Sequence, residues 1–327
     1  MKVWTVTEAD GAFIEEERPK PEPGSGEVLI RVSASGVNPL DTKIRAGKAA
    51  HARHPFPAVL GIDLSGTVAK IGPDVGHLRE GDEVYGMAGG VAGVQGSLSE
   101  YMIADASLVA RKPRNLSMVE AAAMPLAILT AWEGLVDRAN VQAGQAVLIH
   151  GGAGGVGHMA VQLGVAFGAT VHATVSSGKA SIVQGYGAIP IDYQAQKPEE
   201  YIALSPNAQG WDIVYDTVGD SVLDDSFKVV KRYTGHAISC LGWGNHSLAP
   251  LSFRGASYSG VFTLLPLLTG EFRDHHGEIL ARASELAEAG KLRPLLHSKV
   301  FSPSELDDAH KTVTRNGLGK IVVQISH

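Results

Sequence analysis

Two patterns of hydrophobic and polar positions run along the chain. In the first 120 residues, apolar side chains alternate with polar or small ones, as in Val28–Ala34, and turn sequences such as Gly72–Asp74 recur between the apolar runs. Alternation with a period of two predicts half-buried strands, and short strands with frequent turns are typical of a barrel or sandwich. A glycine-rich segment, residues 86–97, interrupts the strands, and we expect it to form a mobile loop.

Between about residues 120 and 260 the pattern changes to an alternation of strands and helices. Ser117–Ala123 predicts a helix that begins with a Ser-x-x-Glu capping box. Val147–Ile149 is typical of a buried strand, Val156–Phe167 has helical spacing, and Thr170–Val175 predicts the next strand. Further short apolar strands are expected at 189–191, 212–216 and 237–241. Strands that alternate with helices predict a parallel sheet, which binds ligands beyond the carboxyl ends of its strands.

The last part of the chain returns to mixed structure. Helices are expected at Ile279–Ala289 and from Ser304 onward, and Lys320–Ile325 predicts a closing strand. A nucleotide-binding domain in mid-chain requires its flanking segments to come together as a second domain. We therefore expect residues 1–122 with 262–327 to form one domain and residues 123–261 the other, with a cleft between the two.

The turn after the first mid-chain strand carries the strongest motif. Gly152-x-Gly154-x-x-Gly157 lies in a strand–turn–helix–strand context and matches the dinucleotide fingerprint. In this interpretation Gly152 allows the tight turn, Gly154 lets the backbone approach a pyrophosphate, and Gly157 brings the helix against the strand. A phosphate loop of an NTPase would need Gly-Lys-Ser/Thr, but His158 follows Gly157. The predicted contacts are Gly152, Ala153, Gly154, Gly155, Val156 and Gly157, with Val218 at the rim of the crevice.

The residues after the second strand predict which dinucleotide binds. An NAD site usually places an acid about 20 residues after the turn, where it holds the ribose 2′-hydroxyl. This chain has no Asp or Glu between Asp137 and Asp192. The strand ends instead in Ser176, Ser177 and Lys179, which offer hydroxyl groups and a cation. These groups suit a 2′-phosphate, so NADPH is the expected cofactor.

Composition narrows the class of protein. The 327 residues are 44% hydrophobic and 19% charged, so the chain can bury a core. Its net charge is −6, and it lacks the clustered basic charge of a nucleic-acid-binding protein. The single cysteine, Cys240, excludes a disulfide framework within one chain. No secretory segment and no run of 18 apolar residues is present, and we expect a cytoplasmic protein that does not bind membranes.

Several motifs in the same order resemble the medium-chain dehydrogenase/reductase superfamily, and within it the zinc-free quinone oxidoreductase (zeta-crystallin-like) family. The motifs are Gly36–Asp41, Gly61–Gly66, Gly81–Val84, Leu129–Trp132, Gly151–Gly157, Tyr215–Gly219 and Gly319–Val323. The resemblance covers nearly the whole chain. It implies an α/β fold in which a Rossmann doubly wound parallel sheet is inserted in a GroES-like, mainly antiparallel β-barrel domain, in a protein that is usually a homodimer.

The resemblance also implies that a catalytic zinc ion is absent. Zinc-dependent relatives keep a Cys, a His and a Cys where Asn38, Ile62 and Leu126 stand in this chain. None of these three side chains belongs to the usual zinc ligands. Without zinc to polarise an alkoxide, alcohol oxidation is disfavoured, whereas hydride addition to a quinone or enone needs only hydrogen-bond help at the developing oxyanion.

By position, the resemblance assigns residues to the site. Asn38, Asp41 and Thr130 would line the nicotinamide and substrate pocket. The residues expected around the 2′-phosphate are Ser176, Lys179, Tyr193 and Arg315. Many relatives have Tyr where this chain has Lys43, which either donates a proton to a substrate oxygen or points to solvent.

The sequence thus predicts a zinc-independent, NADPH-dependent reductase that acts on a quinone or an α,β-unsaturated carbonyl. Two alternatives stay open. The scaffold also permits an enoyl-thioester reductase of the acyl-CoA type. A non-catalytic NADPH-binding protein, with a structural or RNA-associating role as known in this family, is the third interpretation, although the acidic charge balance speaks against RNA.

Overall fold

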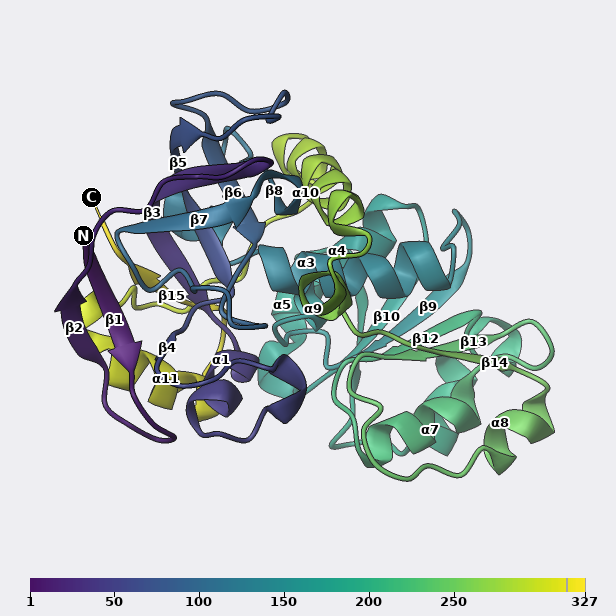
Figure 1. The fold of residues 1–327 in the computed structure, drawn as a ribbon. Helices are drawn as coiled ribbons and strands as arrows, with labels where there is room; N and C mark the ends of the chain where they lie inside the picture. Colours follow the sequence, from purple (N-terminus) through teal and green to yellow (C-terminus); the bar gives the residue numbers. More distant parts are fainter. Residues whose placement is uncertain (316, 327) are drawn as a thin grey trace. The chain divides into compact units, whose positions relative to one another are not determined.

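Two kinds of sheet separate the chain into two units (Figure 1). The structure is a computed structural model that describes residues 1–315 and 317–326. One unit comprises Met1–Leu126 and the residues from Leu264 onward, and the other comprises Ala127–Thr263. Among the helices of the described residues, none combines the length and the apolar character that crossing a bilayer requires.

The unit Ala127–Thr263 contains a six-stranded parallel sheet with the order β11-β10-β9-β12-β13-β14. In chain order this is 3-2-1-4-5-6, the arrangement of a doubly wound dinucleotide-binding fold, which confirms the predicted sheet. The strands are β9 Ala146–His150, β10 Thr170–Val175, β11 Ile189–Asp192, β12 Ile213–Asp216, β13 His236–Ser239 and β14 Ser257–Gly260. Helix α3 (Pro125–Trp132) leads into this unit and is followed by the π-helix Glu133–Arg138. The later helices are α4 Gly157–Ala166, α5 Ala180–Gln184, α6 Pro198–Tyr201, α7 Ser221–Val229 and α8 Ala249–Arg254.

Buried side chains from strands and helices of this unit pack together in a core cluster. All five residues of β9 are buried, as its apolar sequence predicts for a central strand of a parallel sheet. Leu148 packs in a cluster with Trp211, Leu223 and Phe227, all at most 1% exposed. Burying one such side chain stabilises a fold by roughly 1.5–3 kcal/mol, so the position of β9 and of the turn that follows it is firmly fixed.

The other unit is built from antiparallel strands. Its three-stranded sheet has the order β2-β1-β4, and its six-stranded sheet follows β15-β3-β5-β6-β8 with β7 also paired to β3. The strands are β1 Lys2–Val6, β2 Ile14–Glu17, β3 Glu27–Val37, β4 Ala58–Val59, β5 Asp63–Ile71, β6 Glu83–Met87, β7 Tyr101–Asp105, β8 Val109–Arg111 and β15 Ile321–Gln324. The long strand β3 therefore pairs with β5, β7 and β15, so strands from both segments of this unit share one sheet.

Three helices of the antiparallel unit correspond to predicted ones but differ in their bounds, and two further helices were not predicted from the sequence. They are α1 Pro39–Arg45, α2 Met118–Ala122, α9 Leu265–Thr269, α10 Arg273–Glu288 and α11 Leu306–Thr314. The predicted capping box of Ser117 and Glu120 is confirmed at the start of α2. α10 begins six residues before the predicted Ile279, and the turn before α11 is capped by Ser302 and Glu305 instead of Ser304.

The glycine-rich segment 86–97 is packed closely against its own unit. Most of its residues are buried. A Cβ on Gly89 would lie 2.2 Å from the carbonyl oxygen of Gln95, and one on Gly96 would lie 2.2 Å from that of Leu60. These two glycines are therefore needed for close backbone packing, which the sequence interpretation as a mobile loop did not anticipate.

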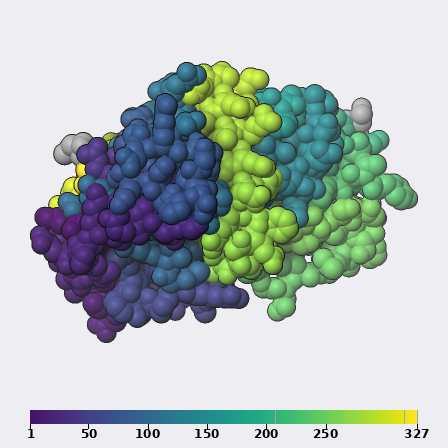
Figure 2. Space-filling model, turned by 45° about the horizontal axis from the view of Figure 1, so that its top comes forward, coloured from purple at the N-terminus to yellow at the C-terminus, as the bar shows by residue number. Residues whose placement is uncertain are grey.

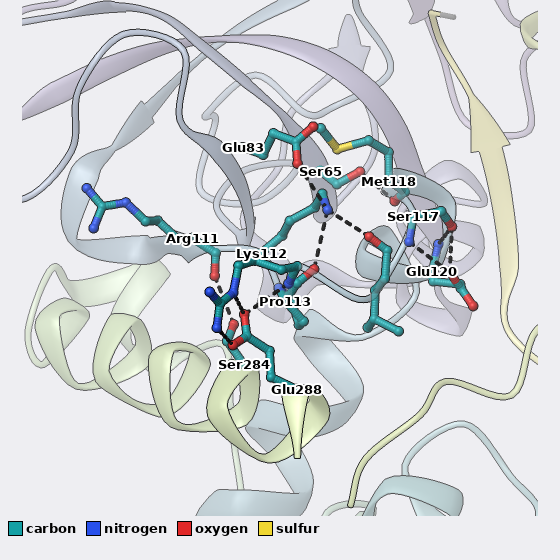
Figure 3. A network of polar contacts seen from close by, with 12 residues as sticks. Ser65, Glu83, Arg111, Lys112, Pro113, Ser117, Met118, Glu120, Ser284 and Glu288 are labelled. Carbon is teal, nitrogen blue, oxygen red and sulfur yellow. Dashed lines mark hydrogen bonds and ion pairs between the residues drawn. The ribbon is translucent and has the colours of Figure 1, made fainter. Parts of the chain in front are cut away.

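A buried lysine holds the segment that leads into α2 (Figure 3). The ammonium group of Lys112 donates hydrogen bonds to the carbonyl oxygens of Leu116 at 2.7 Å and Pro113 at 3.3 Å, and pairs with Glu83 at 3.1 Å. The Lys112 side chain is only 7% exposed. Three oxygen partners satisfy the three ammonium donors, so this loop carries its buried charge without an unpaired donor.

Helix α10 covers the same region of the antiparallel unit. Ser284 Oγ donates to the Arg111 carbonyl at 2.8 Å, and Arg114 makes a bidentate pair with Glu288 at 2.6 and 3.0 Å. Figure 2 shows the yellow-green surface of this helix directly beside the blue surface of the strands of its unit. The segment between β8 and α2 is thus fixed from two sides, and α2 itself is held by Ser65, whose hydroxyl donates to the Met118 carbonyl at 2.7 Å.

Candidate functional site

The turn after β9 is fixed by backbone hydrogen bonds. Gly151 adopts a left-handed conformation with φ of 72°. The Gly154 N–H donates to the Gly151 carbonyl at 2.8 Å, and the Gly152 N–H donates to the Thr174 carbonyl at 3.0 Å. The chain therefore reverses directly at the end of the strand, and α4 starts at Gly157 with its N–H groups close to this turn.

The three glycines of the motif have partly different roles from those predicted. The left-handed conformation that makes the turn belongs to Gly151 and not to Gly152. A Cβ on Gly152 would lie 2.6 Å from the Cβ of Ala173 in β10, so this position needs glycine because of strand packing. A Cβ on Gly157 would lie 2.1 Å from the Gly151 carbonyl oxygen, so glycine at this position lets the start of α4 lie against the turn.

A cavity of about 370 Å³ lies in this unit beside the turn. Of the predicted cofactor contacts, the residues that line it are Ala153, Gly154, Ser176, Lys179, Tyr193 and Val218. Gly155 and Val156 continue the turn between these residues and α4, and Ser177 is the exposed first residue of a short 3-10 helix that ends at Lys179. The fold thus brings the glycine turn and the residues after β10 and β11 around one space.

The chemistry of the cavity suits a dinucleotide with a 2′-phosphate. Ser176 and Lys179 follow directly after the end of β10. In an NAD site this position usually holds the Asp or Glu that binds the ribose 2′-hydroxyl. Asp225 also lines the cavity, but its carboxylate is paired with Lys228 at 2.8 Å. The residues present therefore offer N–H groups for a pyrophosphate, and hydroxyl groups and an ammonium group for a further phosphate.

A second polar cluster lies inside the antiparallel unit. The Asn38 amide Nδ2 donates to Asp63 Oδ2 at 2.9 Å, and its Oδ1 accepts a hydrogen bond from Lys320. Lys320 Nζ also lies 3.8 Å from Asp63 Oδ2, and the Leu126 N–H donates to Asp63 Oδ1 at 2.9 Å. Asn38, Asp63 and Lys320 are all buried. Burial raises the pKa of Asp63 and lowers that of Lys320, while each charge opposes the shift of the other.

Asp41 closes this cluster at the first turn of α1. Its Oδ2 accepts the Asn38 backbone N–H at 2.8 Å and its Oδ1 accepts the Gly61 N–H at 3.2 Å. Burial raises the pKa of Asp41 to about 7, and the nearby charge of Asp63 acts in the same direction. The predicted residues Asn38 and Asp41 are therefore neighbours, and both hold the turn that joins β3 to α1.

The other predicted site residues stand elsewhere. Lys43 is exposed on α1, and Arg315 is exposed at the end of α11, both in the antiparallel unit. Thr130 belongs to α3 in the parallel-sheet unit and is 6% exposed. Its Oγ1 accepts a hydrogen bond from Thr263 at 3.0 Å, and its carbonyl accepts one from the Tyr215 hydroxyl at 2.6 Å. Thr130 is thus held in place by side chains of its own unit.

Sequence reasoning missed Lys320 and Asp63 as members of the Asn38 cluster. Both residues lie in motifs of the resemblance, Asp63 in Gly61–Gly66 and Lys320 in Gly319–Val323, but neither is among the predicted site residues. One signal was present, because a lysine directly before the apolar run Ile321–Val323 is rare in a buried strand unless it is paired. Within residues 1–315 and 317–326, no three His, Cys, Asp or Glu side chains gather in a way that could hold a metal ion.

Two family models match the chain. Residues 24–114 match the model described as alcohol dehydrogenase GroES-like domain, and residues 187–323 match the one described as zinc-binding dehydrogenase. The chain is 37% identical to a 2-methylene-furan-3-one reductase of Solanum lycopersicum and 35% identical to the chloroplastic NADPH-dependent alkenal/one oxidoreductase of Arabidopsis thaliana. Each of these comparisons covers 99% of this chain and 79% of the relative.

Solved structures share the whole fold. An alcohol dehydrogenase superfamily protein from Novosphingobium aromaticivorans is 50% identical with a TM-score of 0.97 over all of both chains. The quinone oxidoreductase from Coxiella burnetii is 28% identical with a TM-score of 0.82, and CurK enoyl reductase is 26% identical with a TM-score of 0.85. The last two each cover 99% of this chain and are themselves covered to 99%.

Proposed function

Since the chain belongs to the medium-chain dehydrogenase/reductase superfamily, among its quinone and alkenal oxidoreductases, we propose that it is a zinc-independent reductase that passes a hydride from NADPH to an α,β-unsaturated carbonyl or a quinone. It is an oxidoreductase, and its cofactor is NADPH. The observation that carries the proposal is the cavity at the glycine turn. There Ser176, Lys179 and Tyr193 offer hydroxyl groups and a cation in place of the carboxylate of an NAD site.

The names of the relatives favour an activated carbon–carbon double bond over a quinone. A 2-methylene-furan-3-one and an alkenal or alkenone each carry a double bond conjugated to a carbonyl group, and these are the compounds for which the two relatives are named. A hydride can add to the β-carbon of such a bond because the charge moves onto the carbonyl oxygen. Hydrogen bonds can stabilise that oxygen without a metal ion.

Zinc-free chemistry is supported by the residues at the three positions where zinc-dependent relatives keep their Cys, His and Cys ligands. Asn38, Ile62 and Leu126 offer no thiolate or imidazole, and the Asn38 amide is engaged by Asp63 and Lys320. We therefore propose that these residues position the substrate side of the site and bind no metal.

The chain's residues bind and orient the cofactor. When bound, NADPH supplies a hydride from C4 of its nicotinamide ring. The N–H groups of the turn Gly151–Gly157 bind the pyrophosphate, and Lys179 and Arg315 bind the 2′-phosphate as cations. Thr130 orients the nicotinamide and the substrate, and the hydrogen bonds from Tyr215 and Thr263 hold it for this role.

The product also needs a proton. In our proposal the proton comes from Lys43 or from water, since Lys43 is exposed on α1. Asp41 accepts hydrogen bonds from two backbone N–H groups and is 1% exposed, so its role is to fix the turn that carries Asn38.

We also propose a homodimer. Within the described sheet, β14 is one of the two outer strands, and its backbone edge can pair with another strand. Tyr233 and Phe253 of the same unit are each 86% exposed. Exposed aromatic side chains of this size are typical of protein interfaces. A cytoplasmic location remains an expectation of the sequence, and the Arabidopsis relative is named as chloroplastic.

The proposal is tested by steady-state kinetics with purified protein. NADPH and NADH are compared with but-3-en-2-one, 1,4-benzoquinone and crotonyl-CoA as acceptors. We expect a higher kcat/KM with NADPH than with NADH, and turnover of the enone above that of the quinone. Equal or better use of NADH contradicts the 2′-phosphate assignment.

The same panel decides between the alternatives. Preferred turnover of crotonyl-CoA supports the enoyl-thioester reductase, which the likeness to CurK enoyl reductase favours as second candidate. Tight NADPH binding without turnover of any acceptor supports the non-catalytic interpretation.

A further inference from the structure

One buried histidine lies at the wall of the cofactor cavity. His150 is the last residue of β9, is 2% exposed, and is among the residues that line the cavity of about 370 Å³. Among the described side chains that line this cavity, its Nε2 is the only buried nitrogen or oxygen atom without a hydrogen-bond partner. An unpaired buried polar group destabilises the folded state, so folded proteins rarely leave one without a purpose.

The other ring nitrogen fixes the orientation of the imidazole. His150 Nδ1 lies 3.3 Å from Thr174 Oγ1, which accepts the Gly151 N–H at 3.0 Å. Because that N–H occupies an acceptor position of the hydroxyl, the Thr174 hydroxyl hydrogen is free to be donated to Nδ1. In this arrangement the ring proton sits on Nε2, which becomes a donor in need of an acceptor.

The charge of the ring indicates the kind of acceptor. Burial lowers the pKa of His150 to about 4, although Asp216 and Asp225 act in the opposite direction, so the imidazole is neutral at pH 7. Lys179 lines the same cavity and supplies a cation for the 2′-phosphate, which leaves the neutral N–H donor of His150 for a different acceptor of the cofactor. The adenosine half of NADPH offers two kinds of uncharged acceptor, the ring nitrogens of adenine and the oxygens of the ribose.

We propose that His150 is a cofactor-positioning residue whose Nε2 donates a hydrogen bond to the adenosine of NADPH, at a ring nitrogen of the adenine or an oxygen of its ribose. This inference rests on the cofactor part of the proposed function and is independent of the substrate. It makes the residue before the glycine turn part of adenosine recognition, in addition to the turn that binds the phosphates. The donor is already oriented by Thr174, so binding requires little reordering of the side chain.

The test uses the fragment 2′,5′-ADP, which contains the adenosine half and the 2′-phosphate but no nicotinamide. Its Kd and that of NADPH are measured by calorimetry for the wild type, His150→Phe, His150→Gln and the matched control His172→Phe. His172 is also buried, on the neighbouring strand β10, but does not line the cavity. We expect His150→Phe to weaken both ligands by about the same factor, roughly tenfold for the loss of one hydrogen bond. We expect His150→Gln, which keeps a donor, to restore part of the affinity, and His172→Phe to leave it unchanged.

A spectroscopic measurement covers the case in which His150→Phe does not fold. In wild-type protein with ¹⁵N-labelled histidine, the Nε2 resonance of His150 should move when 2′,5′-ADP is added. An unmoved resonance at saturation, or a folded His150→Phe variant that binds 2′,5′-ADP like the wild type, overturns the inference. If the wild type fails to bind 2′,5′-ADP at all, the NADPH assignment itself fails, so the two failures are distinguishable.

Discussion

The ammonium group of Lys320 donates a hydrogen bond to the side-chain oxygen of Asn38, 282 positions earlier in the chain. Asn38 precedes α1, and Lys320 precedes the closing strand β15. Asp63 Oδ2 accepts a hydrogen bond from the Asn38 amide and lies 3.8 Å from Lys320 Nζ. The three buried side chains thus form a triad of one cation, one amide and one carboxylate. The turn proposed to face the substrate therefore depends on a residue near the end of the chain.

Replacing the cation should destabilise the protein strongly. In Lys320→Met, the buried carboxylate of Asp63 loses its only nearby ammonium group among the described residues. Breaking a buried pair from one side typically costs about 3–5 kcal/mol, because the remaining charge stays uncompensated. Urea unfolding should show this loss, whereas the exposed Lys48→Met should stay within about 0.5 kcal/mol of the wild type. A Lys320→Met protein as stable as the wild type would contradict the structural role of the triad.

Asp41 should make stability depend on pH. Its pKa in the folded protein is about 7, above the ordinary value of 3.8, so the folded state binds this proton more tightly than the unfolded state. The contribution of Asp41 to the free energy of unfolding is therefore fully present below about pH 4. It is lost as the pH rises to about 7, and the total loss is up to about 4 kcal/mol. We expect the unfolding free energy of the wild type minus that of Asp41→Asn to fall over this interval and to level off above it. A difference that stays constant from pH 4 to 8 excludes the raised pKa.

Lys179 should discriminate between the two nicotinamide cofactors. In Lys179→Met the cation at the cavity is lost, and we expect the Kd of NADPH to rise roughly tenfold, equal to about 1.4 kcal/mol. NADH lacks the 2′-phosphate, so its Kd should change little. Fluorescence titration of both cofactors measures this split, with the exposed Lys291→Met of the other unit as control. An equal loss for NADPH and NADH would place Lys179 away from the 2′-phosphate.

The turn should not tolerate a side chain at Gly157. In Gly157→Ala the new methyl group would stand 2.1 Å from the Gly151 carbonyl oxygen, so α4 or the turn must move. We expect a stability loss of roughly 1–3 kcal/mol and weaker NADPH binding, because overpacking shifts the backbone that binds the pyrophosphate. Gly76→Ala has open space around its Cβ and serves as control. Unchanged affinity and stability in Gly157→Ala would show that the turn can relax.

The parallel-sheet unit could be predicted because its signals are local. The apolar sequence of β9, the glycine turn and the helical spacing of α4 follow one another within about 20 residues, and each fixes its own conformation. The exact role of each glycine could not be predicted in the same way. Gly152 is needed because Ala173 of the neighbouring strand β10 lies close to it, and not because of the turn. The sequence does not show this contact, since Gly152 and Ala173 come together only in the folded sheet.

The Asn38 cluster could be predicted only in part for a related reason. Asn38 and Asp41 share one motif, and their closeness follows from the first turn of a helix. Their partners Asp63 and Lys320 come from β5 and from the residue before β15, and pattern alone does not say which strands pair. Likewise, the glycines of segment 86–97 predict a flexible loop when only the sequence is considered. In the structure, backbone carbonyl groups lie close to Gly89 and Gly96, and the sequence does not show which residues provide them.

The pairing of β3 with β15 has a consequence for biosynthesis. β3 is complete at Val37, but its partner strand begins only at Ile321, after every residue of the parallel-sheet unit has been made. A nascent chain on the ribosome can therefore close the parallel-sheet unit first, while β3 of the antiparallel unit lacks one of its partners until β15 emerges. The antiparallel unit is thus begun before the parallel-sheet unit and completed after it.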